Sequence, residues 1–436
     1  MIYQAHDLVA QSVRTVFHAA AQALNISGGL ANLFNVKSLS PLHRILSETM
    51  ELSGKTFEHL SREHPEARLK IDHVEILGLK HKVEQELVSD KPFCSLMRFT
   101  CNPNKGNKNT KNRNVPKVLL VAPISGHRAT LFQNTVRDLL PDAEVYITEW
   151  KDARDIPVSE GNFDLDTYFD YVQDFLRTIG PDTHMIGISQ STIPVLATTA
   201  LMAAQNDPCK PLSMTLMCGP IDPLVNETEI SRLSRQRDIA WFRDNLIASV
   251  PAHYAGAGRK VFPGFIQAWG MMAAAPQKKH KSPLHVVDEL FRGQGHKLDA
   301  DAPYYLEMIE RVFLEHRVAR NTLYSRNRHA DVSKIKDTGL MVIEGSADNI
   351  AAAGQTKVAH DLCTGIAPHL KDYHLAQGAG HYDVFQGPHW EDKISHKIKD
   401  FWRNIAAFKG ITYDPPHAMN AANNSTFRTV KPALAV

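Results

Sequence analysis

Three side chains that lie far apart in the sequence could together perform acyl transfer: Ser189, Asp348 and His381. A serine hydroxyl is a weak nucleophile at neutral pH, so it needs a base that takes its proton. A histidine is the usual base, and a carboxylate orients it and stabilises the imidazolium that forms. The three residue types therefore suffice for covalent catalysis, provided that the fold brings them together.

The segment around Ser189 predicts a sharp corner between a strand and a helix. Residues 185–188 form a short apolar run suited to a buried strand, and apolar residues recur at helical spacing over 193–204. The pattern Gly187-Ile-Ser189-Gln-Ser191 is G-x-S-x-G with a serine in place of the last glycine. A plain buried strand–helix turn explains this pattern as well as a nucleophile does. Ser191 is the rival nucleophile, but it falls two residues into the predicted helix.

The acid and base candidates each follow a predicted buried strand. Asp348 comes after the strand 339–344, and His381 lies in a glycine-flanked loop after the strand 373–376. The carboxyl ends of parallel strands meet at one edge of a sheet, so we expect both residues to lie near the serine. Asp348 could instead be a turn residue confused with Asn349, but only a carboxylate stabilises imidazolium. Other histidines nearby look like ordinary helix or strand residues: His360, His374 and His389.

An oxyanion hole requires backbone N–H groups aimed at the charge that develops on the substrate carbonyl. The N–H of Gln190, directly after the serine, is one candidate. The second donor should come from the loop after the strand 117–123, where Ser125 and Gly126 lie. Glycine there would let the backbone approach the substrate closely.

Strands that alternate with helices predict β-α-β units and a mainly parallel sheet flanked by helices. The nucleophile, acid and base occur in the order that α/β-hydrolases use, so we expect that fold. Between about residues 226 and 331 no clear strand is found, only helical stretches, which predicts an inserted helical cap. The expected units are an N-terminal helical segment (1–66), the first part of the core (67–225), the cap (226–335), the second part of the core (336–410) and a C-terminal tail (411–436).

Composition narrows the class of protein. The formal charge of +2 over 436 residues gives no reason to expect a nucleic-acid partner. The five cysteines form no C-x-x-C pair, which argues against a disulfide framework or a zinc site. No apolar run approaches the roughly 20 residues that span a bilayer, and polar residues interrupt the first 20 positions where a signal peptide would be apolar. We expect a cytoplasmic protein that needs no metal or cofactor.

Several long blocks of sequence carry a family resemblance, over residues 1 to about 405. They are residues 123–127, 149–154, 188–194, 213–222, 354–363 and 380–385. Together they resemble the intracellular poly(3-hydroxybutyrate) (PHB) depolymerases. That resemblance implies an α/β-hydrolase that degrades amorphous granules of short-chain polyhydroxyalkanoate to 3-hydroxybutyrate monomers and oligomers, with Ser189, Asp348 and His381 as its triad.

One departure from the family concerns the nucleophile, because many members have cysteine where this chain has Ser189. Serine still supports ester hydrolysis through an acyl-enzyme, but acyl transfer to a thiol such as coenzyme A is not assumed. A flexible polyester needs an apolar cleft, which the stretch from residue 262 to 272 could supply. The expected substrate-binding residues are His127, Trp150, Phe262, Phe265, Trp269 and Tyr382.

Three other functions compete with granule depolymerisation. The chain could be a carboxylesterase or acyltransferase that acts on small esters. It could be a relative of the polyester synthases, although a synthase is expected to carry cysteine at position 189. It could also be a non-catalytic granule-associated protein that kept the fold. The preferred side-chain length of the polymer and the oligomeric state stay open.

Overall fold

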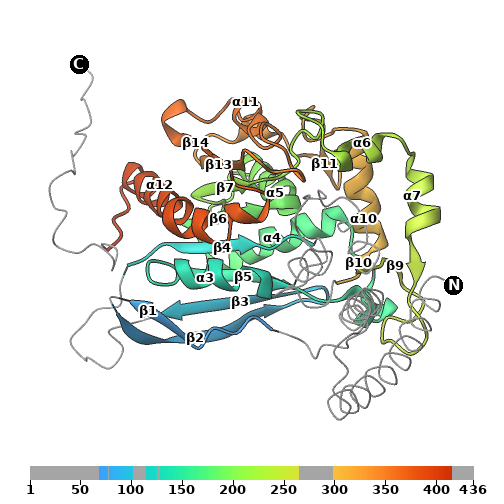
Figure 1. Cartoon of the computed structure of the whole chain (residues 1–436), viewed down its shortest axis with the longest axis horizontal. Helices are drawn as coiled ribbons and strands as arrows, with labels where there is room; N and C mark the ends of the chain where they lie inside the picture. The colour runs from blue at the N-terminus through green and yellow to red at the C-terminus, as the bar shows by residue number, and fades with distance from the viewer. Residues whose placement is uncertain (1–67, 77, 102–113, 125–127, 265–297, 415–436) are drawn as a thin grey trace, which may run out of the picture.

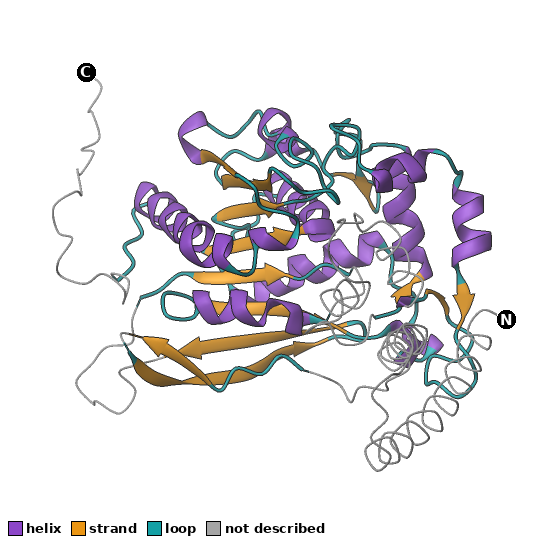
Figure 2. Ribbon diagram, in the orientation of Figure 1, coloured by secondary structure: helices purple, strands orange, loops and turns teal. Residues whose placement is uncertain are grey.

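The computed structural model describes residues 68–76, 78–101, 114–124, 128–264 and 298–414, and its central feature is a nine-stranded sheet with helices on both faces (Figures 1 and 2). The strands, in order across the sheet, are β1 (His73–Ile76), β2 (Leu79–Asp90), β3 (Cys94–Cys101), β5 (Glu144–Trp150), β4 (Lys117–Val121), β6 (Thr183–Ile188), β7 (Ser213–Met217), β13 (Gly339–Gly345) and β14 (Lys371–Ala376).

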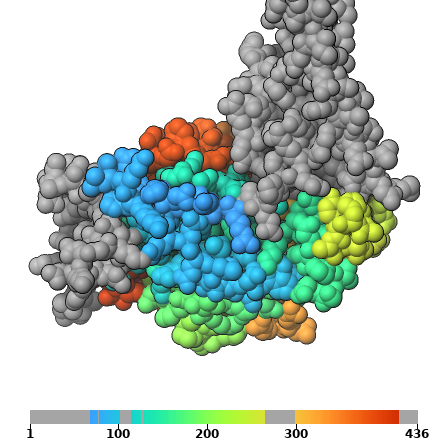
Figure 3. Space-filling model, turned by 90° about the horizontal axis from the view of Figure 1, so that it is seen from below, coloured from blue at the N-terminus to red at the C-terminus, as the bar shows by residue number. Residues whose placement is uncertain are grey.

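The sheet has an antiparallel and a parallel part. Strands β1, β2 and β3 pair antiparallel, and β3 also pairs antiparallel with β5. From β5 through β4, β6, β7 and β13 to β14, every neighbouring pair is parallel. Figure 3, seen from below, shows in blue the surface that the antiparallel strands form. The mainly parallel sheet, its strand order and its flanking helices are those of the α/β-hydrolase fold, so the predicted fold class is confirmed.

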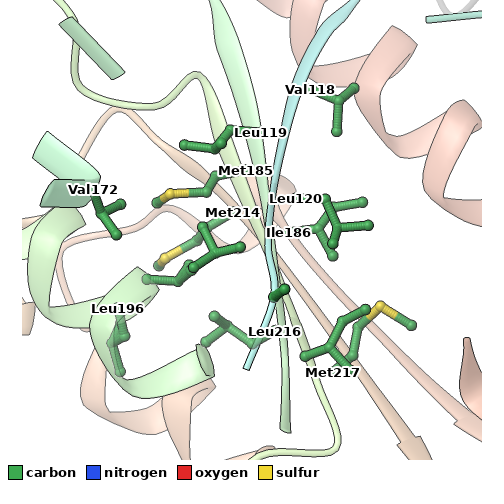
Figure 4. Close-up of a cluster of buried hydrophobic side chains, with 14 of the residues drawn as sticks. Val118, Leu119, Leu120, Val172, Met185, Ile186, Leu196, Met214, Leu216 and Met217 are labelled. Atoms are coloured by element: carbon green, nitrogen blue, oxygen red, sulfur yellow. The ribbon is translucent and has the colours of Figure 1, made fainter. Parts of the chain in front are cut away.

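The central strands are buried on both faces because their side chains alternate between two helical layers. Leu119, Met185 and Met214 point to the side on which Val172 of α4 and Leu196 of α5 lie, while Val118, Leu120, Ile186 and Met217 point to the other side (Figure 4). Helices α4 (Leu165–Ile179) and α5 (Thr192–Ala204) cover the first face, and α3 (Gln133–Leu139) and α12 (Ser395–Phe408) cover the second (Figure 1).

Helix α4 shows how the local sequence sets these elements. Asp164 caps its first turn, because the side-chain oxygen accepts from the N–H of Thr167 at 2.7 Å. A stripe that includes Tyr168 and Val172 is fully buried. The helix ends at Gly180, whose φ of 93° suits glycine. Each large apolar side chain buried in this way contributes about 1.5–3 kcal/mol to folding.

The described part of the segment between β7 and β13, residues 218–264 and 298–338, lies mostly at one end of the sheet (Figure 1). The prediction that it contains no strand is wrong, because its strands are two or three residues long and too short to show an alternating pattern. A buried ion pair joins Arg259, the residue before β9, to Asp301 in β10 (3.2 Å). The described elements are α6 (Glu229–Arg235), α7 (Ile239–Leu246), β8 (Ala248–Ser249), β9 (Lys260–Phe262), β10 (Ala300–Asp301), α10 (Ala302–Met308), β11 (Tyr324–Ser325) and β12 (Arg328–His329).

A second difference concerns the segment between β13 and β14. Its sequence predicts a helix over 353–364, but the structure has only the shorter α11 (Val358–Leu362) there. The buried carboxylate of Glu344 accepts from the N–H groups of Gly354, Thr356 and Lys357 at 2.7–3.0 Å. These hydrogen bonds hold residues 354–357 in turns, so the helix begins only at Val358.

Several parts of the expected units lie outside the described residues: the N-terminal helical segment 1–66, residues 102–113 of the core, residues 265–297 of the expected cap and the tail beyond 414. Among the residues that the structure describes, no helix is both long and apolar enough to cross a membrane.

Candidate active site

Ser189 lies at the corner between β6 and α5, in a backbone conformation that non-glycine residues rarely adopt. Its φ is 57°, whereas the preceding residue is an extended strand residue. Gly187 permits the corner, because a Cβ atom there would lie 2.8 Å from the Val195 side chain. The carbonyl of Ser189 accepts from the Thr192 hydroxyl at 2.8 Å. A strained strand–helix turn of this kind exposes a serine at the end of an α/β-hydrolase sheet, and Ser189 is half-buried.

Ser191, the rival nucleophile, points into the core and is fully buried. Its hydroxyl accepts from the N–H of Ile188 at 2.7 Å and lies 2.6 Å from the carbonyl of Val121, to which it can donate. These bonds connect the corner to the neighbouring strand β4. A serine in place of the usual last glycine of G-x-S-x-G is therefore explained as a tether between two strands.

The structure brings Asp348 and His381 to Ser189. Nδ1 of His381 lies 2.8 Å from Oδ2 of Asp348, and Nε2 lies 3.1 Å from Oγ of Ser189. With Nδ1 protonated, the ring donates to the carboxylate, so Nε2 is free to accept the serine proton. The other carboxylate oxygen accepts from the N–H groups of Ile350 and Ala351 at 2.8 and 3.0 Å. Hydrogen bonds thus fix both carboxylate oxygens of Asp348, while the side chain of the neighbouring Asn349 is exposed.

His381 is buried, and the groups around its ring shift its pKa. Burial opposes charge on the His381 ring, but Cys218 and Asp348 outweigh it and raise the pKa of His381 above its ordinary value of 6.5. The carboxylate is the stronger reason for this direction, because burial raises the pKa of the Cys218 thiol and keeps it protonated at neutral pH. The pair is therefore arranged to stabilise the imidazolium that forms when the histidine takes a proton.

Cys218, Asp348 and His381 also form the one cluster, within the described ranges, of three side chains that could hold a metal ion. Their ligand atoms lie within 4.8 Å of one another. Both ring nitrogens of His381 already have close hydrogen-bond partners. The cluster is accordingly interpreted as a hydrogen-bonded base with a thiol beside it.

The proposed oxyanion donors are only partly described. Gln190 directly follows Ser189 in the short helical turn Ser189–Ser191 before α5, whereas Ser125 and Gly126 lie outside the described residues. The strand end that leads to them is held firmly at Ala122. Its carbonyl accepts from Trp150 Nε1 at 2.7 Å and from the Tyr168 hydroxyl at 3.1 Å.

The hydrogen bond from Trp150 to the Ala122 carbonyl indicates a structural role for this tryptophan. The indole is only 5% exposed, and its edge packs against Tyr168 at a ring distance of 4.5 Å. It therefore supports the β4 strand end and offers almost no surface to a substrate, contrary to its expected role in substrate binding. The reason is that the rings of Phe163 and Tyr168 pack against it.

The other expected substrate-binding residues fall into two groups. Tyr382 follows the base directly and packs edge-on against the His381 ring at 5.6 Å, so it lies beside the site. Phe262 in β9 is nearly buried and stacks on Tyr305 at 3.9 Å. His127, Phe265 and Trp269 lie outside the described residues.

Helix α10 contacts the corner at Ser189 through a residue that the sequence patterns did not single out. The hydroxyl of Tyr304, in α10, lies 3.3 Å from the side-chain oxygen of Gln190 and can donate to it. Tyr304 is buried, and burial raises the pKa of its phenol, so it stays a neutral donor. No local sequence pattern predicts this contact, because the two residues are 114 positions apart in the sequence.

Comparison with known proteins adds the family. Residues 218–406 match the family model described as "PHB de-polymerase C-terminus". This region is a PHB depolymerase domain. Depolymerisation of PHB breaks ester bonds, so the chain is an ester hydrolase. No curated protein matches the chain.

Solved structures of similar architecture include a monoacylglycerol lipase from Paleococcus ferrophilus, with 14% identity over 66% of this chain and 96% of the lipase and a TM-score of 0.43. A putative lipase from Acinetobacter baumannii AYE is 14% identical over 75% of this chain and 93% of its own, with a TM-score of 0.39. An esterase from Thermogutta terrifontis is 13% identical over 78% of this chain and 98% of its own, with a TM-score of 0.41.

The PHB depolymerase domain contributes Asp348, His381, Cys218 and Tyr304, whereas Ser189 lies before it in the chain. Cys218 is the first residue of the matched region and follows β7 directly. Like the acid and the base, Cys218 follows the end of a buried strand, so its position in the sequence was a signal that could have identified it.

Proposed function

We propose that the protein is an intracellular PHB depolymerase that hydrolyses the ester bonds of amorphous short-chain polyhydroxyalkanoate granules. The hydrogen-bonded series from Ser189 through His381 to Asp348 carries the proposal, in a chain that contains a PHB depolymerase domain. The five free cysteines are compatible with a reducing compartment, where such granules would be met inside a cell.

In the proposed mechanism, Ser189 attacks the ester carbonyl while Nε2 of His381 takes its proton. Asp348 holds the ring in the required tautomer and stabilises the imidazolium. The negative charge on the carbonyl oxygen is bound by the N–H of Gln190 and a second donor near residues 125–126, each worth about 3 kcal/mol of barrier when well placed.

Collapse of this intermediate releases the alcohol end of the polymer, which accepts the proton from His381. Water then attacks the acyl-serine ester, and His381 takes a proton from that water and returns it to Ser189. Deacylation releases the acyl fragment with a new free carboxylate. Each cycle therefore cuts one ester bond and leaves a fragment with a hydroxyl end and a fragment with a carboxylate end.

Release of 3-hydroxybutyrate from amorphous PHB granules tests the proposal when it is compared with hydrolysis of p-nitrophenyl butyrate. We expect the wild type to act on both and Ser189→Ala on neither, while Ser189→Cys keeps part of the activity. Ser249→Ala, an exposed serine in β8, is the matched control and should behave as wild type. Activity on the small ester alone would favour a carboxylesterase, and granule binding with no product would favour a non-catalytic role.

A further inference from the structure

Cys218 lies next to the base in the interior of the protein. It is fully buried, and its Sγ lies 3.8 Å from the backbone carbonyl of His381, within range of a weak S–H donation. A ring nitrogen of His381 lies within 4.8 Å of the same sulfur, as does a carboxylate oxygen of Asp348. Both ring nitrogens already have hydrogen-bond partners, so the sulfur, with its proton directed to the carbonyl, acts on the charge of the ring through its lone pairs and not as a further N–H acceptor.

The backbone at Cys218 is held in an unfavourable conformation. Its φ is 42°, which costs a non-glycine residue about 1 kcal/mol or more. The N–H of Cys218 donates to the Ile343 carbonyl at 2.9 Å. The next residue, Gly219, donates its N–H to the Thr356 hydroxyl at 2.8 Å and accepts from it at 2.9 Å. Bonds to two other segments thus fix the position of the thiol.

The same turn packs against the start of α5, the helix that follows the serine. A Cβ atom at Gly219 would lie 1.9 Å from Oγ1 of Thr192, so only glycine fits there. That Thr192 hydroxyl is the one that donates to the Ser189 carbonyl. Cys218 is therefore held between the nucleophile corner and the loop of the base.

We propose that Cys218 is a positioning residue of the site, whose thiol anchors the backbone of His381 and whose sulfur stabilises the imidazolium formed when His381 takes the Ser189 proton. This inference rests on the proposed role of His381 as the base. The titratable groups that act on the ring are Asp348, after β13, and Cys218, after β7. Asp383, in the loop of the base, instead accepts from the Gly380 N–H at 2.8 Å.

A histidine titration by NMR tests the inference without any substrate, with the His381 signal assigned by its loss in His381→Gln. We expect the pKa of His381 to fall by roughly half a unit or more in Cys218→Ala, because the imidazolium loses a partner. Cys218→Ser, which keeps a donor and lone pairs at shorter reach, should lie between. Cys94→Ala, a buried cysteine in β3, is the control for thiol loss alone and should leave the pKa unchanged.

Kinetics on p-nitrophenyl butyrate provide the second readout. In Cys218→Ala we expect kcat to fall by about tenfold with little change in KM, and the rising limb of the pH–rate profile to move to lower pH. An unchanged His381 pKa and an unchanged limb in both Cys218 variants would overturn the inference, even if their melting temperatures fell. Full activity of Ser189→Ala would instead overturn the proposed function, while the NMR result would still decide the position of Cys218.

Discussion

Nε2 of His381 lies 3.1 Å from Oγ of Ser189, although 192 residues separate the two in sequence. The parallel sheet is what joins them, since β6 ends one residue before the serine and β14 ends five residues before the histidine. A contact within hydrogen-bond reach allows direct proton transfer from the hydroxyl to the ring. The consequences of this contact can be measured residue by residue.

Substitution of Asp348 by Asn should reduce kcat for ester hydrolysis by about 10³–10⁴-fold, because an amide no longer fixes the reactive tautomer or stabilises imidazolium. Its remaining oxygen can still accept from the N–H groups of Ile350 and Ala351, so folding should be retained. Asn349→Ala, at the exposed neighbour, should retain wild-type kcat. Equal losses in the two variants would show that the loop, and not the carboxylate, matters.

The pH dependence of kcat/KM should follow His381, which must be neutral to act as a base. Because burial is outweighed by Cys218 and Asp348, its folded pKa is raised above 6.5, so activity should rise with pH along a limb centred above 6.5. A limb at or below 6.5 would contradict this assignment.

The raised pKa of His381 also affects stability. A raised folded pKa favours the protonated native state, so this contribution is present in full below pH 6.5 and is lost as pH rises through the folded pKa. The difference in unfolding free energy between wild type and His381→Gln should shrink over that range. Denaturant titrations at several pH values measure it, and a difference that grows with pH would be inconsistent with a raised value.

Glu344→Gln should destabilise the protein by about 2–4 kcal/mol, because a buried carboxylate that serves several donors is replaced by an amide whose NH₂ faces them. Besides three backbone N–H groups, Glu344 accepts from the Tyr373 hydroxyl at 2.9 Å. Urea denaturation measures the loss. Glu229→Gln, which removes an exposed pair with Arg232, should change stability by no more than about 1 kcal/mol. Equal stability of Glu344→Gln and wild type would mean that the carboxylate is dispensable.

The parallel sheet and the residues at its strand ends could be predicted from the sequence, because the central strands have a clear apolar pattern. Central strands such as β4 and β13 contain runs of four consecutive apolar residues, so their place in a parallel sheet could be inferred, and with it the residues that follow them. The short strands β8 to β12 leave no periodic signal. The contact of Tyr304 with Gln190 and that of Cys218 with His381 depend on tertiary packing between distant segments, which no local spacing records.

The identity of the nucleophile is the claim on which the mechanism depends, and labelling with a fluorophosphonate followed by peptide mass spectrometry tests it directly. We predict a single adduct on Ser189, absent in Ser189→Ala and formed far more slowly in His381→Gln. An adduct on Ser191 or another residue, or a rate that does not depend on His381, would contradict the account.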